Sequence, residues 1–553
     1  ALIAALTACV ANVASAENTQ KLTTTVVKSE NESSVSHTIK AITADDISKK
    51  SLSNIEDITR YMPGVQVNDV GNRFGDNGFN IRGLQGDDVA VTVDGISLGE
   101  TLAPEAFSAY GMYDSTRGQV ELEHVKVITI TKGPNSVASG SNALAGSVAY
   151  TTFDAVDFLN SDGDDTAVKV KLGYDSRSAE TLANFTFANR TGAFESLLQL
   201  TTRDGNEIEA HSSGKAITAP ASATEVADQF SIETQSILAK FSYEFAEGQR
   251  FGVLFDQTDR TADGKPLSRQ SSSYFDFVTD DENNKTRYGL FYTWDNANNV
   301  AFDSLSVTLD QQALFTSGIT TFGYSPRSGD PYLRREDRST EQDSTSLNID
   351  FEKFIAGDIS HELIYGIKWE SREIENIRWD RRYNDLTDTS GYRNGYPIRD
   401  TAWVPVTKTE VLNLYVSDKI QLTEQFSLSA GLRYDSTEYS PTVDDTFTDI
   451  SGDSVFDSSF SALAGELVAE FEFVPHNFIL ASYSQGYKAP SAQDLYLGTD
   501  GSNLITDINT DVEYMDLDTV ANADLEAEES SSIELGYKLA TEYASVTITA
   551  YKT

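Results

Sequence analysis

Cysteine is almost absent from this chain. The single cysteine among 553 residues is Cys9, so a disulfide scaffold and a zinc–thiolate site are both excluded for the rest of the protein. Basic residues are also few, with 42 of them against 85 acidic residues and a net charge of −43. That balance argues against nucleic acid as a partner, because phosphate recognition needs a basic surface.

Long hydrophobic runs are missing after residue 16. No stretch reaches 18 apolar residues, so the sequence predicts no transmembrane helix. The lack of long apolar runs is still compatible with strands of a transmembrane β-barrel, since each strand needs only about 9–11 residues that alternate between apolar and polar. The motifs G-x-S-x-G, H-E-x-x-H and the P-loop are absent as well, and we therefore expect no enzyme.

An export signal is expected at the N-terminus. Residues 1–16 read "ALIAALTACVANVASA", an apolar run that ends in a small-x-small cleavage pattern. We expect the mature chain to start at Glu17 and the sequence itself to lack its initiator Met. Two alternatives stay open: lipid attachment at Cys9 within "LTAC", and a buried N-terminal helix.

The region 42–157 has a mixed pattern. Short helix and strand signals alternate there with many glycines. We expect a helix that begins at Thr43, has apolar residues at Ile47, Leu52, Ile55 and Ile58, and stops at Pro63 and Gly64. We also expect a strand over Val89–Ile96, with a turn at Asp94 and Gly95, and a second strand over His124–Pro134.

From about Thr166 the pattern is β only. Runs that alternate with period two, such as "SLSAGLRYD" and "SVTITAYK", predict about 15 strands. Short connections at Phe245–Gly248 and Phe473–Asn477 alternate with long polar ones, which we place at Asp204–Glu233, Thr316–Asp343 and Arg372–Val406. Short turns at one end and long loops at the other are typical of an outer-membrane barrel, although a large soluble β protein is an alternative. Because the chain stops inside an alternating run, we expect further strands beyond Thr553.

Four motifs resemble the plug of TonB-dependent outer-membrane receptors, in that family's order and spacing. They are "MPGVQV" (Met62–Val67), "IRGL" (Ile81–Leu84), "VDGIS" (Val93–Ser97) and "KGPNSVASGSNALAGSVAYTT" (Lys132–Thr152). The resemblance implies an N-terminal α+β plug inside the lumen of a 22-stranded transmembrane β-barrel, of which about 15 strands are present. The implied domains are a signal peptide (1–16), a TonB-box segment and linker (17–41), the plug (42–157) and an incomplete barrel (166–553).

The plug motifs supply a set of candidate structural residues. We expect the glycines to provide turns and close packing, and Arg82 to pair with carboxylates of the barrel, since a buried guanidinium needs a partner. The set is Pro63, Gly64, Arg82, Gly83, Asp94, Gly95, Lys132, Gly133 and Gly146.

The segment "KLTTTVVKSE" (Lys21–Glu30) resembles the family's TonB box. An extended strand there could add to the sheet edge of a partner through main-chain hydrogen bonds. A disordered linker with β-prone residues is the alternative. The proposed box consists of Thr23, Thr24, Thr25, Val26 and Val27.

Three further stretches resemble the haemoglobin/haem (transferrin/lactoferrin) receptor branch: "GSVAYTTFDAVDFL" (Gly146–Leu159), "YKAPSAQDLY" (Tyr487–Tyr496) and "ANADLEAEESSSIELGYK" (Ala521–Lys538). In that branch the last two correspond to boxes that flank a loop with a haem-ligating histidine. This chain departs from the pattern, because no histidine lies between Ala489 and Leu525. Tyrosine and methionine can also ligate haem iron, and aromatic rings can stack on the macrocycle. The ligand-binding candidates are Tyr110, Met112, Tyr113, Tyr487, Pro490, Tyr496, Tyr514, Met515 and His211.

Other features bear less directly on the ligand. His124 and His476 are interpreted as packing and turn residues, and the identity of any bound metal is left unknown. The acidic loop Thr499–Glu529 is interpreted as solvated, with calcium or a basic protein surface as alternative partners.

The resemblance implies TonB-dependent transport of haem or haem-derived iron across the outer membrane of a Gram-negative cell, by a multi-pass β-barrel without a covalent cofactor. Its partners would be the TonB complex, haem, a haem protein or a siderophore, and outer-membrane lipid. An iron–siderophore or other metal-chelate receptor is the first alternative. A secreted β-rich binding protein without transport is an alternative of another class.

Overall fold

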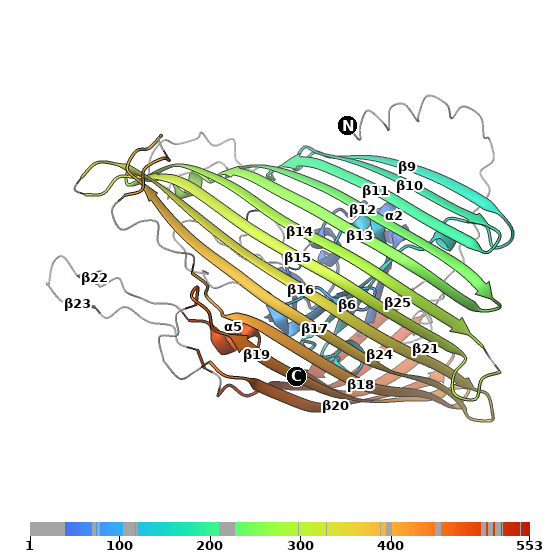
Figure 1. Cartoon of the computed structure of the whole chain (residues 1–553). Helices are drawn as coiled ribbons and strands as arrows, with labels where there is room; N and C mark the ends of the chain where they lie inside the picture. Colours follow the sequence, from blue (N-terminus) through green and yellow to red (C-terminus); the bar gives the residue numbers. More distant parts are fainter. Residues whose placement is uncertain are drawn as a thin grey trace.

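The computed structural model describes residues 39–68, 73, 78–102, 117, 120–208, 227–296, 298–327, 329–387, 389–393, 401–447, 455–498, 505–506, 513–514, 521–522, 524–541 and 544–553. They form a small N-terminal domain, residues 39–157, which we call the plug, and one large sheet, which we call the wall. The wall curves around the plug, which lies in its concavity (Figure 1).

The plug is built on a five-stranded sheet of order β1-β7-β8-β5-β6, in which β5 and β8 run parallel. Its core is aliphatic, with Ile81, Ile128, Ile130 and Val148 each fully buried. A three-stranded sheet, β2-β3-β4, joins the same core through Val65. The strands are β1 (Ile39–Thr43), β2 (Val65–Asn68), β3 (Gly78–Ile81), β4 (Leu84–Gln85), β5 (Val89–Val93), β6 (Ile96–Ser97), β7 (Val125–Lys132) and β8 (Gly146–Thr152).

The predicted single helix after Thr43 is wrong, because the chain forms two helices there. Thr43 does cap α2 (Ala44–Lys50) with a complete capping box. Ser51 then adopts a left-handed conformation, and Asn54 caps the separate helix α3 (Ile55–Thr59). Local capping by these polar residues therefore overrides the helical spacing of the apolar ones. Among the described residues, no helix is long and apolar enough to cross a membrane.

The wall is a 15-stranded sheet in which every strand pairs antiparallel with its neighbours, as the strand count predicted. β9 and β25 are its two edges. The strands are β9 (Asp165–Asp175), β10 (Glu180–Thr191), β11 (Phe194–Asn206), β12 (Gln229–Ala246), β13 (Gln249–Lys265), β14 (Tyr274–Asp295), β15 (Ser304–Tyr324), β16 (Tyr332–Ile355), β17 (Ser360–Tyr383), β18 (Val406–Thr423), β19 (Phe426–Thr442), β20 (Ser458–Val474), β21 (Asn477–Lys488), β24 (Glu528–Ala540) and β25 (Ser545–Lys552).

The two faces of the wall differ in polarity. On β18, Leu412, Leu414 and Val416 are exposed on the outer face, while Thr409 and Asn413 are buried on the inner face. Successive side chains of a strand point to opposite faces, so the outer surface is apolar and the plug-facing surface is polar. This is the reverse of a soluble β protein and the pattern of a barrel in lipid.

Connections at the two ends of the wall are unequal in length. At one end they span 192–193, 247–248, 296–303, 356–359, 424–425, 475–476 and 541–544. The opposite end carries the long ones, among them 207–228, 384–405, 443–457 and 489–527. The last contains α5 (Ala492–Tyr496) and the small strands β22 (Ile505–Thr506) and β23 (Glu513–Tyr514).

Two predicted loops are wrong in extent. Most of Thr316–Asp343 is strand, in β15 and β16, and β17 continues through Tyr383 into the predicted loop Arg372–Val406. These strand ends carry polar residues on both faces, as in "YLRREDRSTEQD" at the start of β16. A strand without an apolar face lacks the alternation on which the prediction relied.

Candidate functional site

Ion pairs join the plug to the wall. Most of them set a plug carboxylate against a wall cation whose side chain points inward. The pairs of this kind are Asp57–Arg177, Asp88–Lys488, Asp94–Arg287, Glu100–Arg372, Glu121–Arg203, Glu123–Lys171 and Asp154–Lys240. Where both side chains are largely buried, as in Glu100–Arg372 and Glu121–Arg203, breaking the pair costs more than breaking a surface pair.

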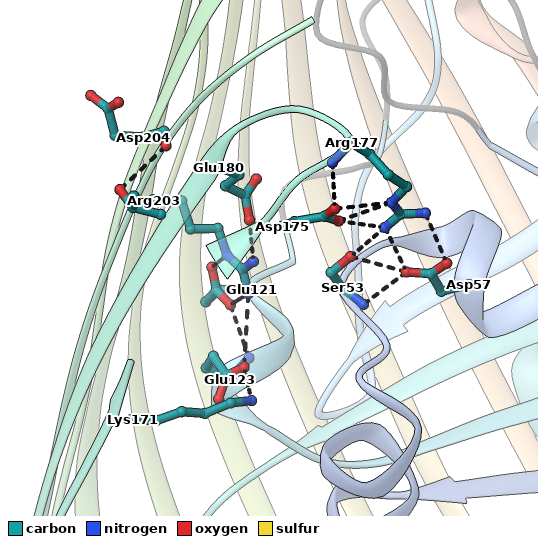
Figure 2. Close-up of polar contacts among 11 residues, drawn as sticks. Ser53, Asp57, Glu121, Glu123, Lys171, Asp175, Arg177, Glu180, Arg203 and Asp204 are labelled. Atoms are coloured by element: carbon teal, nitrogen blue, oxygen red, sulfur yellow. Dashed lines mark hydrogen bonds and ion pairs between the residues drawn. The ribbon is translucent and has the colours of Figure 1, made fainter. Parts of the chain in front are cut away.

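Figure 2 shows the pairs on the first wall strands. Arg203 on β11 donates to both carboxylate oxygens of Glu121 at 2.8 Å and also to Glu180. Burial opposes ionisation of Glu121, but Arg203 outweighs it and lowers the pKa of Glu121 to about 2. Nearby, Arg177 in the β9–β10 turn reaches Asp57 and Ser53 next to α3. The helical N-terminal part of the plug is thus tied directly to the wall.

Arg82 pairs with a carboxylate of the wall, as the sequence predicted. Its Nη1 lies 2.5 Å from Oε1 of Glu534 on β24, and both side chains are almost fully buried. Its guanidinium also lies over the ring of Tyr551, 3.9 Å from the centroid. A Cβ at Gly133 would lie 2.7 Å from Arg82 Nη1, so the glycine makes room for the pair. The same Cβ would lie 3.0 Å from Oε1 of Glu534, so a distant wall residue helps to explain this plug glycine.

Asp94 occupies the turn between β5 and β6 with φ of 50°. Its carboxylate accepts hydrogen bonds from the amide and hydroxyl of Thr152 and pairs with Arg287. Burial alone would raise the pKa of Asp94, but Lys240, Arg287 and the Thr152 donors together lower it to about 2. The Asp-Gly motif therefore fixes the turn and also anchors it to β14.

Glu100 connects the plug to α5. One carboxylate oxygen pairs with Arg372 of β17 at 3.0 Å, and the other accepts the amide hydrogen bond of Ala492, also at 3.0 Å. The backbone of Glu100 exchanges two hydrogen bonds with the side chain of Gln342 on β16. Burial raises the pKa of Glu100 against the effect of Arg372. Through its carboxylate and its backbone, this one buried residue thus connects the plug, two wall strands and the start of α5.

The end of β21 is hydrogen-bonded to the plug through the backbone of Tyr487. The amide of Tyr487 donates to Ser136 Oγ at 2.9 Å, and the carbonyl of Tyr487 accepts from the amide of Asn142 at 3.1 Å. Lys488 pairs with Asp88 at 3.0 Å. The stretch that resembles a ligand-loop box therefore packs on the α4 segment of the plug (α4, Ser136–Ser139).

The described ligand candidates lie in a buried apolar cluster at this place. Tyr487 and Tyr496 belong to it together with Trp403 and Leu495, and Pro490 is buried beside them. The Tyr496 hydroxyl donates to the Phe456 carbonyl at 2.9 Å. In this arrangement the three residues hold α5 in place, and direct contact with a ligand would require α5 to move.

Several predicted residues lie outside the described part of the chain. These are the proposed TonB box, Thr23, Thr24, Thr25, Val26 and Val27, and the candidates Tyr110, Met112, Tyr113, His211 and Met515. Tyr514 is described only as a backbone position in β23. Their roles stay predictions.

The histidines within the described residues make structural contacts. His124 is 3% exposed and shares a hydrogen bond with Thr201 Oγ1 at 3.0 Å. His476 occupies the β20–β21 turn with φ of 67°, and His361 contacts Asp418. In the described parts of the chain, His, Cys, Asp and Glu form no cluster of three or more suited to a metal ion.

A cavity of about 520 Å³ lies between plug and wall. On the plug side it is lined by the β5–β6 turn and by α4 with the residues that follow it. On the wall side it is lined by β16–β19 and the end of β21, including Asn348, Lys368, Arg372, Arg433 and Lys488. It meets Glu100 and Ser491 at the level of α5, so one chamber connects the α5 region with the deeper part of the plug.

The inward-facing cations of the wall were missed by the sequence reasoning. Arg203, Arg287, Arg372 and Arg433 each occupy a strand position whose side chain points to the plug. A signal was available, because a charge at an inward position of an alternating strand is costly unless it has a partner. Which plug carboxylate Arg203, Arg287 and Arg372 meet follows only from the tertiary fold, whereas Arg433 pairs with Asp435 on its own strand.

Comparisons with known proteins agree with this architecture. Residues 231–553 match the family described as TonB dependent receptor-like, beta-barrel, and residues 31–147 match the TonB-dependent Receptor Plug Domain. Among solved structures, a Serratia marcescens hemophore receptor, HasR, in complex with its hemophore HasA and heme, has a TM-score of 0.66 at 14% identity, covering 93% of this chain and 72% of that one. The copper transporter OprC has a TM-score of 0.65 at 13% identity, covering 93% and 71%. These similarities concern the fold.

Curated relatives are similar over about half of the chain. Hemoglobin-binding protein A of Haemophilus influenzae is 34% identical over 307 residues, which are 52% of this chain and 29% of that protein. Hemoglobin and hemoglobin-haptoglobin-binding protein C of the same species is 36% identical over 237 residues, 41% of this chain and 22% of that protein. The matched region thus spans less than a third of either relative.

Proposed function

Because this chain belongs to the TonB-dependent receptor family, we propose that it transports haem or haem-derived iron across the outer membrane of a Gram-negative cell. The choice of haem as the ligand is supported by the similarity, at 34% identity, to a relative named for binding haemoglobin. The apolar outer face of the wall supports a place in lipid.

In the proposed cycle, ligand binds at the long-loop end and displaces α5. The bond between the Ala492 amide and Glu100 then breaks, which alters the plug and frees the segment Thr23–Val27 for TonB. Force from TonB would act next on the plug–wall pairs and open a path for the ligand. Tyr110, Met112, Tyr113, Tyr514, Met515 and His211 are the proposed ligand contacts, with Tyr487, Pro490 and Tyr496 behind them. Outer-membrane lipid, TonB and haem or a haem protein are the proposed partners.

An iron–siderophore or another metal chelate is the second candidate ligand. It is favoured by the lack of histidine between Ala489 and Leu525, since imidazole is a common axial ligand of haem iron.

Absorption titration of the full-length protein with haem separates the two ligands. We expect a Soret shift at micromolar haem that disappears in a Tyr514→Phe/Met515→Leu variant, because these substitutions remove the phenolate and thioether but keep the side-chain volumes. If the protein shows no Soret shift and a siderophore restores growth of the cells, haem is rejected as the ligand and the metal chelate is favoured.

A further inference from the structure

Two cations on nearby strands of the wall line the cavity. Lys368 on β17 and Arg433 on β19 both line it, and Tyr415 on β18 lies between them. The Nζ of Lys368 is 5.8 Å from the centroid of the Tyr415 ring, and Cζ of Arg433 is 5.5 Å from the same centroid. We call these two side chains the cation pair.

Both members of the pair have donors that the protein does not use. Among the described residues, none forms a hydrogen bond or an ion pair with the Lys368 ammonium, and Asp350 attracts it only at longer range. Arg433 is 2% exposed, and its Nη1 is buried without a hydrogen-bond partner. A buried donor without a partner costs free energy that a bound acceptor would recover.

The nearby carboxylates are engaged with other groups. Asp435 accepts from Nε of Arg433 at 3.0 Å and also from the amide of Asn413. Asp350 accepts a hydrogen bond from the Tyr415 hydroxyl. These acids offset part of the positive charge, and Oδ2 of Asp435 is itself buried without a hydrogen-bond partner. They nevertheless leave Nη1 of Arg433 and the Lys368 ammonium without a hydrogen bond, on two residues that line the cavity.

Two glycines of the plug lie beside the cation pair. A Cβ at Gly95 would lie 3.9 Å from Lys368 Nζ and 4.0 Å from Nδ2 of Asn348. A Cβ at Gly140 would lie 2.6 Å from Nη2 of Arg433. Both glycines have positive φ, 81° and 87°, so the plug cannot readily carry a side chain at either position. Gly140 therefore leaves room for the Arg433 guanidinium, and Gly95 adds no side chain beside the Lys368 ammonium.

We propose that Lys368, Arg433 and the Asn348 amide form an anion site for carboxylate groups of the transported ligand, in the cavity between plug and wall. This inference rests on the proposed function for the identity of the ligand, but the site itself follows from the unused donors. A carboxylate offers the oxygen pair that a guanidinium and an ammonium bind best.

The anion site is tested first without the transported ligand. Thermal unfolding of the purified full-length protein in detergent is measured with and without citrate at constant ionic strength. We expect citrate to raise the midpoint of the wild type and of Lys408→Gln, a control at an exposed pair on β18, because a ligand of the native state stabilises it. Lys368→Arg should keep the shift, and Lys368→Gln/Arg433→Gln should lose it. An equal shift in the double variant, or none in the wild type, would reject the site.

Uptake by cells then identifies the source of the carboxylate. We expect the double variant to bind haem at the surface like the wild type but to take it up about five- to tenfold more slowly. Uptake of haem dimethyl ester, which lacks free carboxylates, should be the same in both. Equal loss for haem and ester would show a structural defect and reject carboxylate recognition. A wild type that takes up no haem would reject the proposed function, while the citrate result would still decide the anion site.

Discussion

At the scale of residues, buried charge pairs give the plug its attachment. Arg82–Glu534 is the clearest case, with side chains 9% and 2% exposed. Sequence reasoning could predict that Arg82 needs an acidic partner, since burial of a lone guanidinium is costly. It could not identify Glu534, which lies on β24 and is brought near only by the curvature of the wall around the plug (Figure 1).

Loss of one member of this pair should loosen the plug. We expect Arg82→Ala to lower the opening free energy of the plug by about 3–5 kcal/mol, since Glu534 is left buried without its cation. Hydrogen exchange of the β7 and β8 amides measures this quantity. Arg60→Ala is the control, because it removes a pair in which the arginine is 51% exposed, and the cost there should be under about 1 kcal/mol. Equal effects of the two substitutions would contradict the role of burial.

His124 should make the plug sensitive to pH. Burial lowers its pKa from 6.5 to about 4, against the opposite effect of Glu121 and Asp256; Lys285 and Arg203 lower it further. Between pH 6.5 and pH 4, His124 binds a proton in the unfolded chain but not in the folded plug. The free energy of unfolding is therefore highest above pH 6.5 and falls as the pH drops toward 4. The loss should approach about 3 kcal/mol.

The same exchange experiment at pH 7, 6 and 5 checks the sign and the size of this effect. The stabilisation that Glu121 provides should change with pH only below about pH 4.5, where it is lost, because the pKa of Glu121 is lowered from 4.5 to about 2. In His124→Gln the slope between pH 6.5 and 4.5 should disappear. A slope that persists in this variant would assign the pH dependence to another group.

At the scale of elements, α5 is held by its own cap and by the plug. Ser491 and Asp494 form a capping box at its start, a local pattern that the sequence displays. The bond from the Ala492 amide to Glu100 joins residues 392 positions apart, and no local pattern predicts it. The plug motifs thus indicated the strands and turns of the domain, whereas its contacts with the long-loop end required the structure.

Substitution of Glu100 should release α5. In Glu100→Ala the Ala492 amide loses a charged acceptor, a loss of about 1.5–3 kcal/mol. We expect a roughly ten- to hundredfold decrease in exchange protection of the 489–498 segment. Glu100→Gln keeps an acceptor oxygen and should retain most of the protection. Similar loss in both variants would indicate that the charge on Arg372, rather than the hydrogen bond, controls α5.

The strands illustrate which parts of the wall could be predicted. Where one face of a strand is apolar, as in β19 with "SLSAGLRYD", alternation identified the strand. The first half of β16 has no apolar face, since "RREDRSTEQD" is polar throughout, and its strand was mistaken for a loop. Cross-strand pairing with β15 and β17 holds it in the sheet instead.

At the scale of the whole molecule, the polarity of the wall is the property that suits it to a membrane. We expect Leu414→Arg, on the apolar outer face, to destabilise the folded protein in lipid by about 2–4 kcal/mol. Leu386→Arg is the control, because Leu386 is similarly exposed but lies in the long connection 384–405. Heat-dependent gel mobility of the membrane-inserted protein reports the folded fraction. Equal tolerance of both substitutions would contradict a lipid-facing wall.

The central claim is that an energised partner drives ligand past the plug. It is tested most directly by initial uptake of radiolabelled iron-haem in cells that carry or lack TonB, with surface binding measured in parallel. We expect equal surface binding in both strains and uptake only where TonB is present. Uptake at the same rate without TonB would contradict it.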